Sequence, residues 1–592
     1  MLKRFFLIVC GSFVGAFLAL VVFMLSAILL SVAMLNMGKG GHKVADKSVL
    51  HLCLEGPMEE RVGAEELDVM SLIQGGITPY MSLEETLQAL EVAKTDDRIE
   101  GVLIECKGVS AAPATLRQVR QAVIDFKKSG KFVYAYGNEG YDQSDYYVAT
   151  AADSIFINPI GAVSVHGIAS VTPYFKKVLD KVGVEMQVVR VGTYKSAVEP
   201  FMIDSISPAN REQQELYLGN IWGTMSSEMA ASRKLSVSAL NLLADSITFT
   251  MPTAKLKASH LIDGICYRHE LDSRLKRLCD LDEDDDLRLV SITDLAANYE
   301  YKKGKDGDIA VVYAVGEIDG GSGGINSEEI VATVEDLMKD DDVKGMVLRV
   351  NSPGGSAFGS EQIWEVLERF KKTGRPLAVS MGDYAASGGY YISCGADHIF
   401  ADSVTITGSI GVFGMIPCME ELVHDKIGVN VSVVKTNANA EMGASTGLLS
   451  KKFTPVQLAA MQNYVNQTYD LFTKRCADGR HMPQDSIKMI AEGRVWDAKS
   501  AMERKLIDAY GSLNDAIAWV AQKAGLAQDR YGVLTAPAIE MNWRTMLSSF
   551  ASMKVQQKLQ EEMGLFYEYY DQLQAILNRR HVLCLMPYSE IK

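Results

Sequence analysis

The chain has 592 residues, of which 48% are hydrophobic and 22% charged, and its formal net charge at pH 7 is −15. This length suits about three or four domains of average size. The acidic balance argues against nucleic acid as a partner, because phosphate binding needs a basic patch. The nine cysteines are scattered and form no Cys-x-x-Cys pair, so we expect neither a zinc site nor a disulfide framework, and no cofactor.

The amino terminus predicts a membrane anchor. Two basic residues, Lys3 and Arg4, precede an uncharged apolar run over residues 5–35. About 20 such residues span a bilayer, and basic residues before the run favour a cytoplasmic amino terminus. We therefore predict a single transmembrane helix within residues 1–37, with the remaining chain outside the cytoplasm. A cleavable signal peptide, with a cleavage-like site at residues 31–33, is the alternative.

The next part of the chain, residues 38–300, alternates strand-like and helix-like patterns. Strands are predicted near 49–54, 101–105, 131–136 and 154–158, and helices over 116–127, 146–151 and 174–182. The acidic run 280–286 and the basic segment 302–307 indicate a solvated linker.

Residues 301–535 then repeat the same order of elements. Strands are predicted at 309–315, 343–350, 376–381 and 398–401, and helices at 362–371, 387–394 and 419–426. Strands that alternate with helices imply an α/β fold with parallel sheets. Residues 536–592 have no counterpart in the first half, and their Met, Gln, Leu and aromatic content predicts a helical extension, most simply a packing arm.

The two halves are copies of one another. Tyr146-Tyr147-Val148 aligns with Tyr390-Tyr391-Ile392 at an offset of 244 residues (390 minus 146). The copies differ at two positions where chemistry is possible. Ser409 of the second copy lies opposite Val165, and Lys195 of the first copy lies opposite Ala440. Because a repeat is an architectural unit, these complementary losses indicate one site built from both copies.

Three motifs carry this hypothesis. Residues 351–356 (NSPGGS) directly follow a strand, and their glycines let backbone N–H groups approach a ligand and stabilise an oxyanion. Residues 407–412 (TGSIGV) present a serine between glycines, although a helix-capping serine would have a similar pattern. Residues 192–197 (GTYKSA) place Lys195 between apolar segments. Burial would lower the pKa of this lysine and let its neutral amine accept a serine proton.

These motifs, together with YAASGGYY (384–391) and GRVWDAKSA (493–501), resemble the signal peptide peptidase A family in its long, duplicated form. That family of membrane-bound serine proteases is related in fold to the Clp protease and crotonase superfamily. The resemblance covers about residues 40–535 and leaves the carboxy-terminal extension outside.

The resemblance implies a Ser-Lys dyad. It makes Ser409 the nucleophile, Lys195 the general base, and the N–H groups of Gly354 or Gly355 and of Ile410 the oxyanion donors. It also implies a homotetramer in a bacterial inner membrane, with the catalytic domains on the periplasmic side. The expected substrates are signal peptides left after secretion.

Several alternatives remain open at this stage. A Clp-like triad would need a histidine after the serine, and His424 is the nearest candidate. Ser387 is a second serine candidate, although its glycine-rich surroundings also suit a closely packed helix start. Two other functions are possible: a crotonase-like enzyme acting on acyl-thioesters, and a membrane scaffold without activity.

Overall fold

The computed structural model describes residues 44–62, 80–299, 307–321, 324–444, 451–527, 530–537, 582–586 and 590–591. The predicted transmembrane segment lies outside these ranges. Within them, no helix is both long enough and apolar enough to cross a bilayer.

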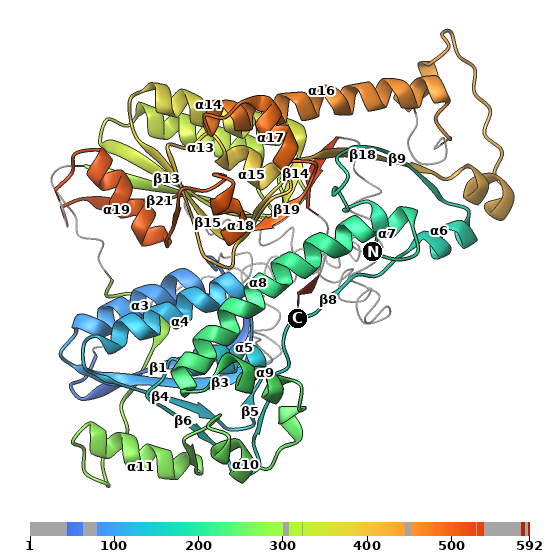
Figure 1. Ribbon diagram of the computed structural model, residues 1–592. Coiled ribbons are helices and arrows are strands. Elements are labelled where there is room, and N and C mark those ends of the chain that lie inside the picture. Colours follow the sequence, from blue (N-terminus) through green and yellow to red (C-terminus); the bar gives the residue numbers. More distant parts are fainter. Residues whose placement is uncertain are drawn as a thin grey trace, which may run out of the picture.

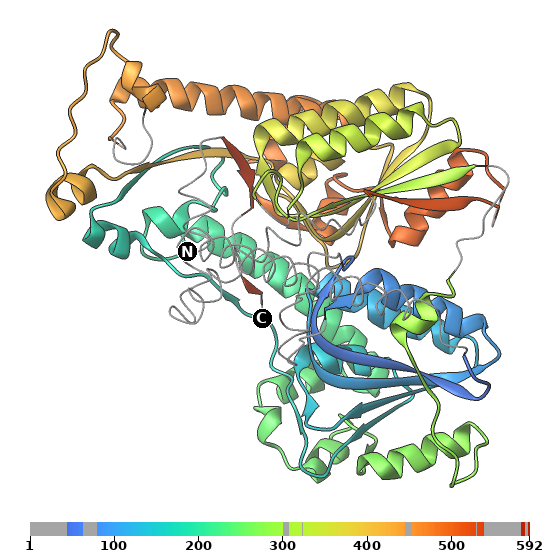
Figure 2. The same ribbon diagram turned by 180° about the vertical axis from the view of Figure 1, so that it is seen from behind.

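The chain forms two α/β lobes, one from each copy (Figure 1). The blue and green lobe is the first copy, and the yellow to red lobe is the second. The long helix α8 (Pro208–Arg233) runs between the two lobes in both views (Figure 2). This helix begins at Pro208, which suits the first turn, and the side chain of Ser207 caps it by accepting a hydrogen bond from the N–H of Asn210.

The first lobe is built on a parallel sheet of order β10-β6-β4-β3-β1-β11, with β2 paired to β1. Its strands are β1 (Ser48–Glu59), β2 (Met81–Ser82), β3 (Ile99–Ser110), β4 (Phe132–Gly137), β6 (Ser154–Ile157), β10 (Gly264–Ile265) and β11 (Leu289–Ser291). Its helices, besides α8, are α3 (Leu83–Thr95), α4 (Pro113–Lys127), α5 (Gln143–Ala149), α6 (Lys176–Val182), α7 (Glu199–Met202), α9 (Val237–Ala244), α10 (Thr253–Ala258), α11 (Arg268–Leu278) and α12 (Ile292–Ala296).

The second lobe repeats this plan with a sheet of order β19-β17-β15-β13-β12-β21, to which β16 and β20 are added. Its strands are β12 (Asp308–Val315), β13 (Val343–Ser352), β15 (Leu377–Ala386), β16 (His398–Ala401), β17 (Ile406–Gly408), β19 (Val495–Asp497), β20 (Ala509–Tyr510) and β21 (Gly532–Ala536). Its helices are α13 (Ser327–Lys339), α14 (Ala357–Lys372), α15 (Gly388–Ser393), α16 (Pro455–Gly479), α17 (Gln484–Ile490), α18 (Ala498–Glu503) and α19 (Leu513–Lys523). The predicted α/β fold with parallel sheets is therefore confirmed.

Residues that both copies keep make the same contacts in each lobe. Asp153 accepts a hydrogen bond from the N–H of Val133 at 2.8 Å, and Asp397 accepts one from the N–H of Leu377 at 2.9 Å. Both carboxylates thus tie a loop to the neighbouring strand, as expected for a residue retained for structure.

An arm of the first copy reaches into the second. Strand β9 (Glu185–Val191) pairs antiparallel with β18 (Val412–Cys418) over seven consecutive residue pairs. Figure 1 shows the two strands side by side, β9 in teal and β18 in orange. Because β9 leads directly to the loop that holds Lys195, this pairing carries the first copy's lysine to the second copy's lobe.

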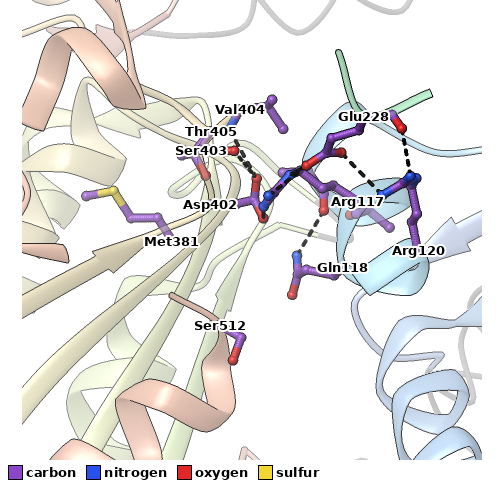
Figure 3. A network of polar contacts seen from close by, with 12 residues as sticks. Arg117, Gln118, Arg120, Glu228, Met381, Asp402, Ser403, Val404, Thr405 and Ser512 are labelled. Carbon is purple, nitrogen blue, oxygen red and sulfur yellow. Dashed lines mark hydrogen bonds and ion pairs between the residues drawn. The ribbon is translucent and has the colours of Figure 1, made fainter. Parts of the chain in front are cut away.

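Polar contacts also join the lobes. Arg117 on α4 donates to Asp402 Oδ2 of the second copy and to Glu228 Oε1 on α8, both at 2.9 Å (Figure 3). Deeper in the interface, Arg349 of β13 pairs with Glu60 at 2.7 Å, and both side chains are almost completely buried. The orientation of one copy on the other is therefore fixed by charged groups that have little access to water.

Most of the carboxy-terminal extension, for which a helix is predicted, lies outside the described residues. In its described part, Leu583–Leu585 and Glu590–Ile591 are strands β22 and β23, not helices. Each pairs with a strand elsewhere in the chain, β22 with β14 (Gly354–Ser356) and β18, and β23 with β8 (Ser170–Val171). Backbone partners far away in sequence, which composition does not encode, determine this conformation.

Candidate active site

Lys195 lies at the junction of the two copies and is completely buried. Its Nζ atom is 2.7 Å from Ser387 Oγ, 3.1 Å from Ser409 Oγ and 3.1 Å from the backbone oxygen of Ser409. Two glycines leave space for the side chain of this lysine. A Cβ at Gly493 would lie 2.6 Å from Lys195 Cβ, and one at Gly411 would lie 3.2 Å from Lys195 Cδ.

The charge of this lysine is strongly perturbed. Burial, which disfavours the charged form, lowers the pKa of Lys195 from 10.5 to about 7. The contacts of Nζ within the described chain are three uncharged oxygen atoms, and no ion pair offsets the loss of solvent. A substantial fraction of the amine is therefore neutral near pH 7 and able to accept a proton.

Ser387 stands at the sharp turn between β15 and α15. Its backbone has φ 56° and ψ −112°, a conformation that is costly for a residue with a side chain. Gly389 allows the turn to pack tightly, since a Cβ there would lie 2.6 Å from the backbone oxygen of Ser352. A strained serine between a strand and a helix is the geometry that exposes the nucleophile in many hydrolases.

Ser409 lies in the loop between β17 and β18, also with a positive φ of 51°. Its N–H donates to the carbonyl of Arg494 at 2.7 Å, and its Oγ donates to the carbonyl of Gly493 at 3.4 Å. The proton of this hydroxyl therefore has a carbonyl acceptor besides Lys195.

The glycine turn adjoins Ser387 rather than Ser409. A Cβ at Gly354 would lie 2.7 Å from the nitrogen of Gly388, the residue after Ser387. The N–H of Gly354 donates to Ser352 Oγ at 3.2 Å, and Gly355 belongs to the same short strand, β14. Ile410 is buried, and its carbonyl accepts the N–H of Gly493 at 2.9 Å.

The structure thus places Lys195 beside both candidate serines and not beside His424. That histidine lies in the helical turn Leu422–Ile427, where its exposed ring contacts Asp425.

The motifs of the sequence did not indicate that Ser387 contacts Lys195. The comparison of the two copies contained the signal, since the offset of 244 residues puts Gln143 opposite Ser387. In the first lobe, Gln143 accepts the N–H groups of His166 and Gly167, both at 2.9 Å. The first copy has therefore replaced this serine as well. The side-chain amide of Gln143 instead holds the loop that contains His166 and Gly167.

A buried lysine that is partly neutral at neutral pH, within reach of serine hydroxyls and a glycine turn, provides the groups that a serine hydrolase needs. The comparisons define the class further. The model of peptidase family S49 matches residues 125–282 and again residues 369–527, one match in each copy. The chain therefore belongs to peptidase family S49 and is a serine protease.

Relatives of similar length support this assignment. The chain is 36% identical to Protease 4 of Salmonella typhi over 76% of this chain and 73% of that protein. It is 34% identical to Protease 4 of Haemophilus influenzae over 85% of this chain and 84% of that protein. The chloroplastic serine protease SPPA of Arabidopsis thaliana is 30% identical over 82% of this chain and 70% of that protein.

Proposed function

We propose that this protein is a membrane-anchored endopeptidase that uses a Ser-Lys dyad, with Ser387 as the nucleophile and Lys195 as the general base. This proposal replaces the sequence-based assignment of Ser409 as the nucleophile. Ser409 instead becomes a positioning residue that holds the lysine amine.

The hydrogen bonds of Lys195 support this choice. A neutral amine has two N–H donors and one lone pair. The backbone oxygen of Ser409 can only accept, so it takes one N–H. Ser409 Oγ accepts the second N–H, because its own proton goes to the carbonyl of Gly493. The lone pair is then left for the closest contact, the hydroxyl of Ser387 at 2.7 Å.

The catalytic cycle follows from these roles. Lys195 removes the proton of Ser387 as Oγ attacks the peptide carbonyl, and the protonated amine then gives that proton to the leaving amine. Backbone N–H groups of the glycine turn and of Gly388 stabilise the oxyanion, so Gly388 takes the place predicted for Ile410. Water activated by Lys195 then hydrolyses the acyl-enzyme.

The substrate and the location are proposed from relatives and from sequence. A protein of Enterococcus faecium that bears the name putative signal peptide peptidase SppA is 32% identical over 40% of this chain and 66% of that protein. Together with the apolar amino-terminal run, this favours hydrophobic remnant signal peptides, cleaved outside the cytoplasm at a bacterial inner membrane. We further propose that the protein is a homotetramer.

The nucleophile can be identified with a fluorophosphonate probe and a peptide hydrolysis assay. Ser387→Ala should lose the label, and its kcat should fall by about 10⁴-fold or more. Ser409→Ala should keep the label and lose about 10- to 30-fold in rate, because it removes one hydrogen bond that orients the lysine. Ser393→Ala is the matched control, since its Oγ only bonds the carbonyl of Gly389 within α15.

Labelling that survives in Ser387→Ala but not in Ser409→Ala would restore Ser409 as the nucleophile. Labelling and hydrolysis that survive both changes would refute the dyad. An acyl-thioesterase without a serine nucleophile, the crotonase-like alternative, would not react with the probe even in the original enzyme.

A further inference from the structure

The side chain of Gln213 lies against the lysine loop, the segment of residues 192–197 that carries Lys195. Gln213 is a buried residue in the second turn of α8. Its Nε2 atom donates to the carbonyl oxygen of Tyr194 at 3.2 Å and to Ser196 Oγ at 3.0 Å. These two residues directly flank Lys195 in the sequence. A single amide group therefore holds the chain on both sides of the proposed general base.

The oxygen of the same amide reaches the segment that holds Ser409. Gln213 Oε1 accepts the N–H of Val495 at 3.0 Å. That N–H belongs to the peptide group whose carbonyl, on Arg494, accepts the N–H of Ser409 at 2.7 Å. The N–H of Val495 can only donate and the carbonyl of Tyr194 can only accept, which fixes the orientation of the amide. Gln213 thus links the lysine of the first copy to the serine loop of the second.

A second group of contacts joins the same two segments closer to solvent. Glu212, the preceding residue of α8, accepts hydrogen bonds from Arg494 at 2.7 Å and from the hydroxyl of Tyr194 at 3.2 Å. The guanidinium of Arg494 also lies over the rings of Tyr194 and Trp496, at 4.4 Å and 4.5 Å from their centroids. Because the side chain of Glu212 is exposed, water competes with its contacts. The buried amide of Gln213 is therefore the stronger of the two links.

Helix α8 keeps Gln213 in a fixed place. In the first turn, the side chain of Asn210 donates to Glu199 Oε2 at 3.0 Å and accepts a hydrogen bond from Gln213 Nε2 at 3.0 Å. Further along the helix, Ile221 and Met225 pack in the core of the first lobe. The helix is thus anchored in that lobe, while its second turn presents the amide to the junction of the two copies.

The second copy lacks this glutamine. Its helix α16 corresponds to α8, since Pro455 is its first residue as Pro208 is the first residue of α8, an offset of 247 residues (455 minus 208). The same offset puts Ala460 opposite Gln213. The helix can therefore form without the amide. The copy without the lysine also lacks the glutamine, which indicates that the two residues act together.

We propose that Gln213 is a positioning residue for the proposed Ser-Lys dyad. By tying the lysine loop to the peptide group before Val495, it holds Lys195 Nζ within reach of Ser387. The inference rests on the proposed function and adds to it a residue outside the reacting pair. A displacement of about 1 Å by a change away from the reacting atoms can cost about 10²-fold in rate.

Gln213→Met tests the proposal, because methionine has a similar length but carries no N–H donor and no carbonyl. We expect kcat for peptide hydrolysis to fall about 10²-fold and KM to stay within about twofold. The acid limb of kcat/KM should move up by about one pH unit, because a displaced lysine regains contact with water and its pKa returns toward 10.5. A purely structural residue would change the urea midpoint and leave the acid limb in place.

Gln214→Met is the matched control. Gln214 is the next residue of α8 and is also buried, but the side-chain hydrogen bond that it makes within the described chain is a long one, to Asn210 at 3.4 Å. This variant should keep kcat within about twofold and leave the acid limb unchanged.

Gln213→Glu keeps the test valid if Gln213→Met folds poorly, since glutamate retains the length of the side chain and the acceptor for the N–H of Val495. Its carboxylate cannot donate to Tyr194, so the lysine loop loses that bond. Its negative charge also favours the charged form of Lys195, raises the pKa of the amine and moves the acid limb upward.

Lys195→Met, assayed beside these variants, separates the inference from the proposed function. If Lys195→Met is inactive while the folded Gln213 variants keep the original kcat and acid limb, the inference is overturned and the proposed function stands. Activity that survives Lys195→Met would refute the proposed dyad and the inference with it, since no base would remain to be positioned.

Discussion

The pH dependence of hydrolysis tests whether Lys195 acts as a base, because kcat/KM reports the ionisation of the free enzyme. Burial lowers the pKa of this lysine to about 7. Only the neutral amine accepts a proton, so activity should rise about tenfold per pH unit below pH 7 and level off above it. At pH 5, about 1% of the plateau activity should remain.

The measurement is an initial-rate profile of kcat/KM from pH 5 to pH 10 with an uncharged peptide ester. Circular dichroism at each pH checks that the protein remains folded. Ser409→Ala provides a second profile with an expected shift of the acid limb, because it removes one hydroxyl contact of the lysine. A rate that still climbs between pH 9 and pH 10 would mean an ordinary lysine, and the buried-base reasoning would be wrong.

Three further perturbations follow from the structure. Lys195→Met should raise the urea midpoint at pH 7, because a lysine pKa lowered from 10.5 to about 7 costs about 5 kcal/mol of stability. This cost is full below pH 7 and disappears as the pH rises to 10.5, so the original protein should gain stability over that window and Lys195→Met should not. Arg349→Met should lower the unfolding free energy by about 3–5 kcal/mol, since it leaves the buried carboxylate of Glu60 unpaired, and adding Glu60→Gln should recover part of the loss. Gly493→Ala should reduce kcat by about 10²-fold by displacing Lys195, whereas Gly219→Ala, whose Cβ would meet nothing within 4 Å, should keep full activity.

The repeated α/β plan was predictable because local patterns encode it. The apolar segment 49–54 became the interior of β1, and the helix predicted over 116–127 is the body of α4, which begins three residues earlier at Pro113. The pairing of β9 with β18 was not predictable, since antiparallel partners more than 200 residues apart leave no local pattern in either strand. The short strand at Leu583–Leu585 escaped detection for the same reason.

The candidate site was predicted in part. The copy comparison correctly brought Lys195 into contact with Ser409, because a complementary loss marks residues that meet. Ser387 also lacks a serine counterpart in the first copy, but the two glycines that follow it equally fit a purely structural turn. The contacts of the two hydroxyls depend on the three-dimensional structure, and these distinguish the two serines: Lys195 Nζ lies closer to Ser387 Oγ, whereas Ser409 Oγ also donates to the carbonyl of Gly493.

The arm formed by β9 makes the meeting of the catalytic lysine and serine an event within one molecule. The lysine is delivered to the serines by a strand of the same polypeptide. Assembly of this pair is therefore a first-order event whose equilibrium is independent of protein concentration. A peptidase with only one copy of the domain would have to recruit the lysine from a second molecule, and its pair would come apart on dilution. For this chain, the occupancy of the Lys195–Ser387 contact should be the same at nanomolar and at micromolar protein.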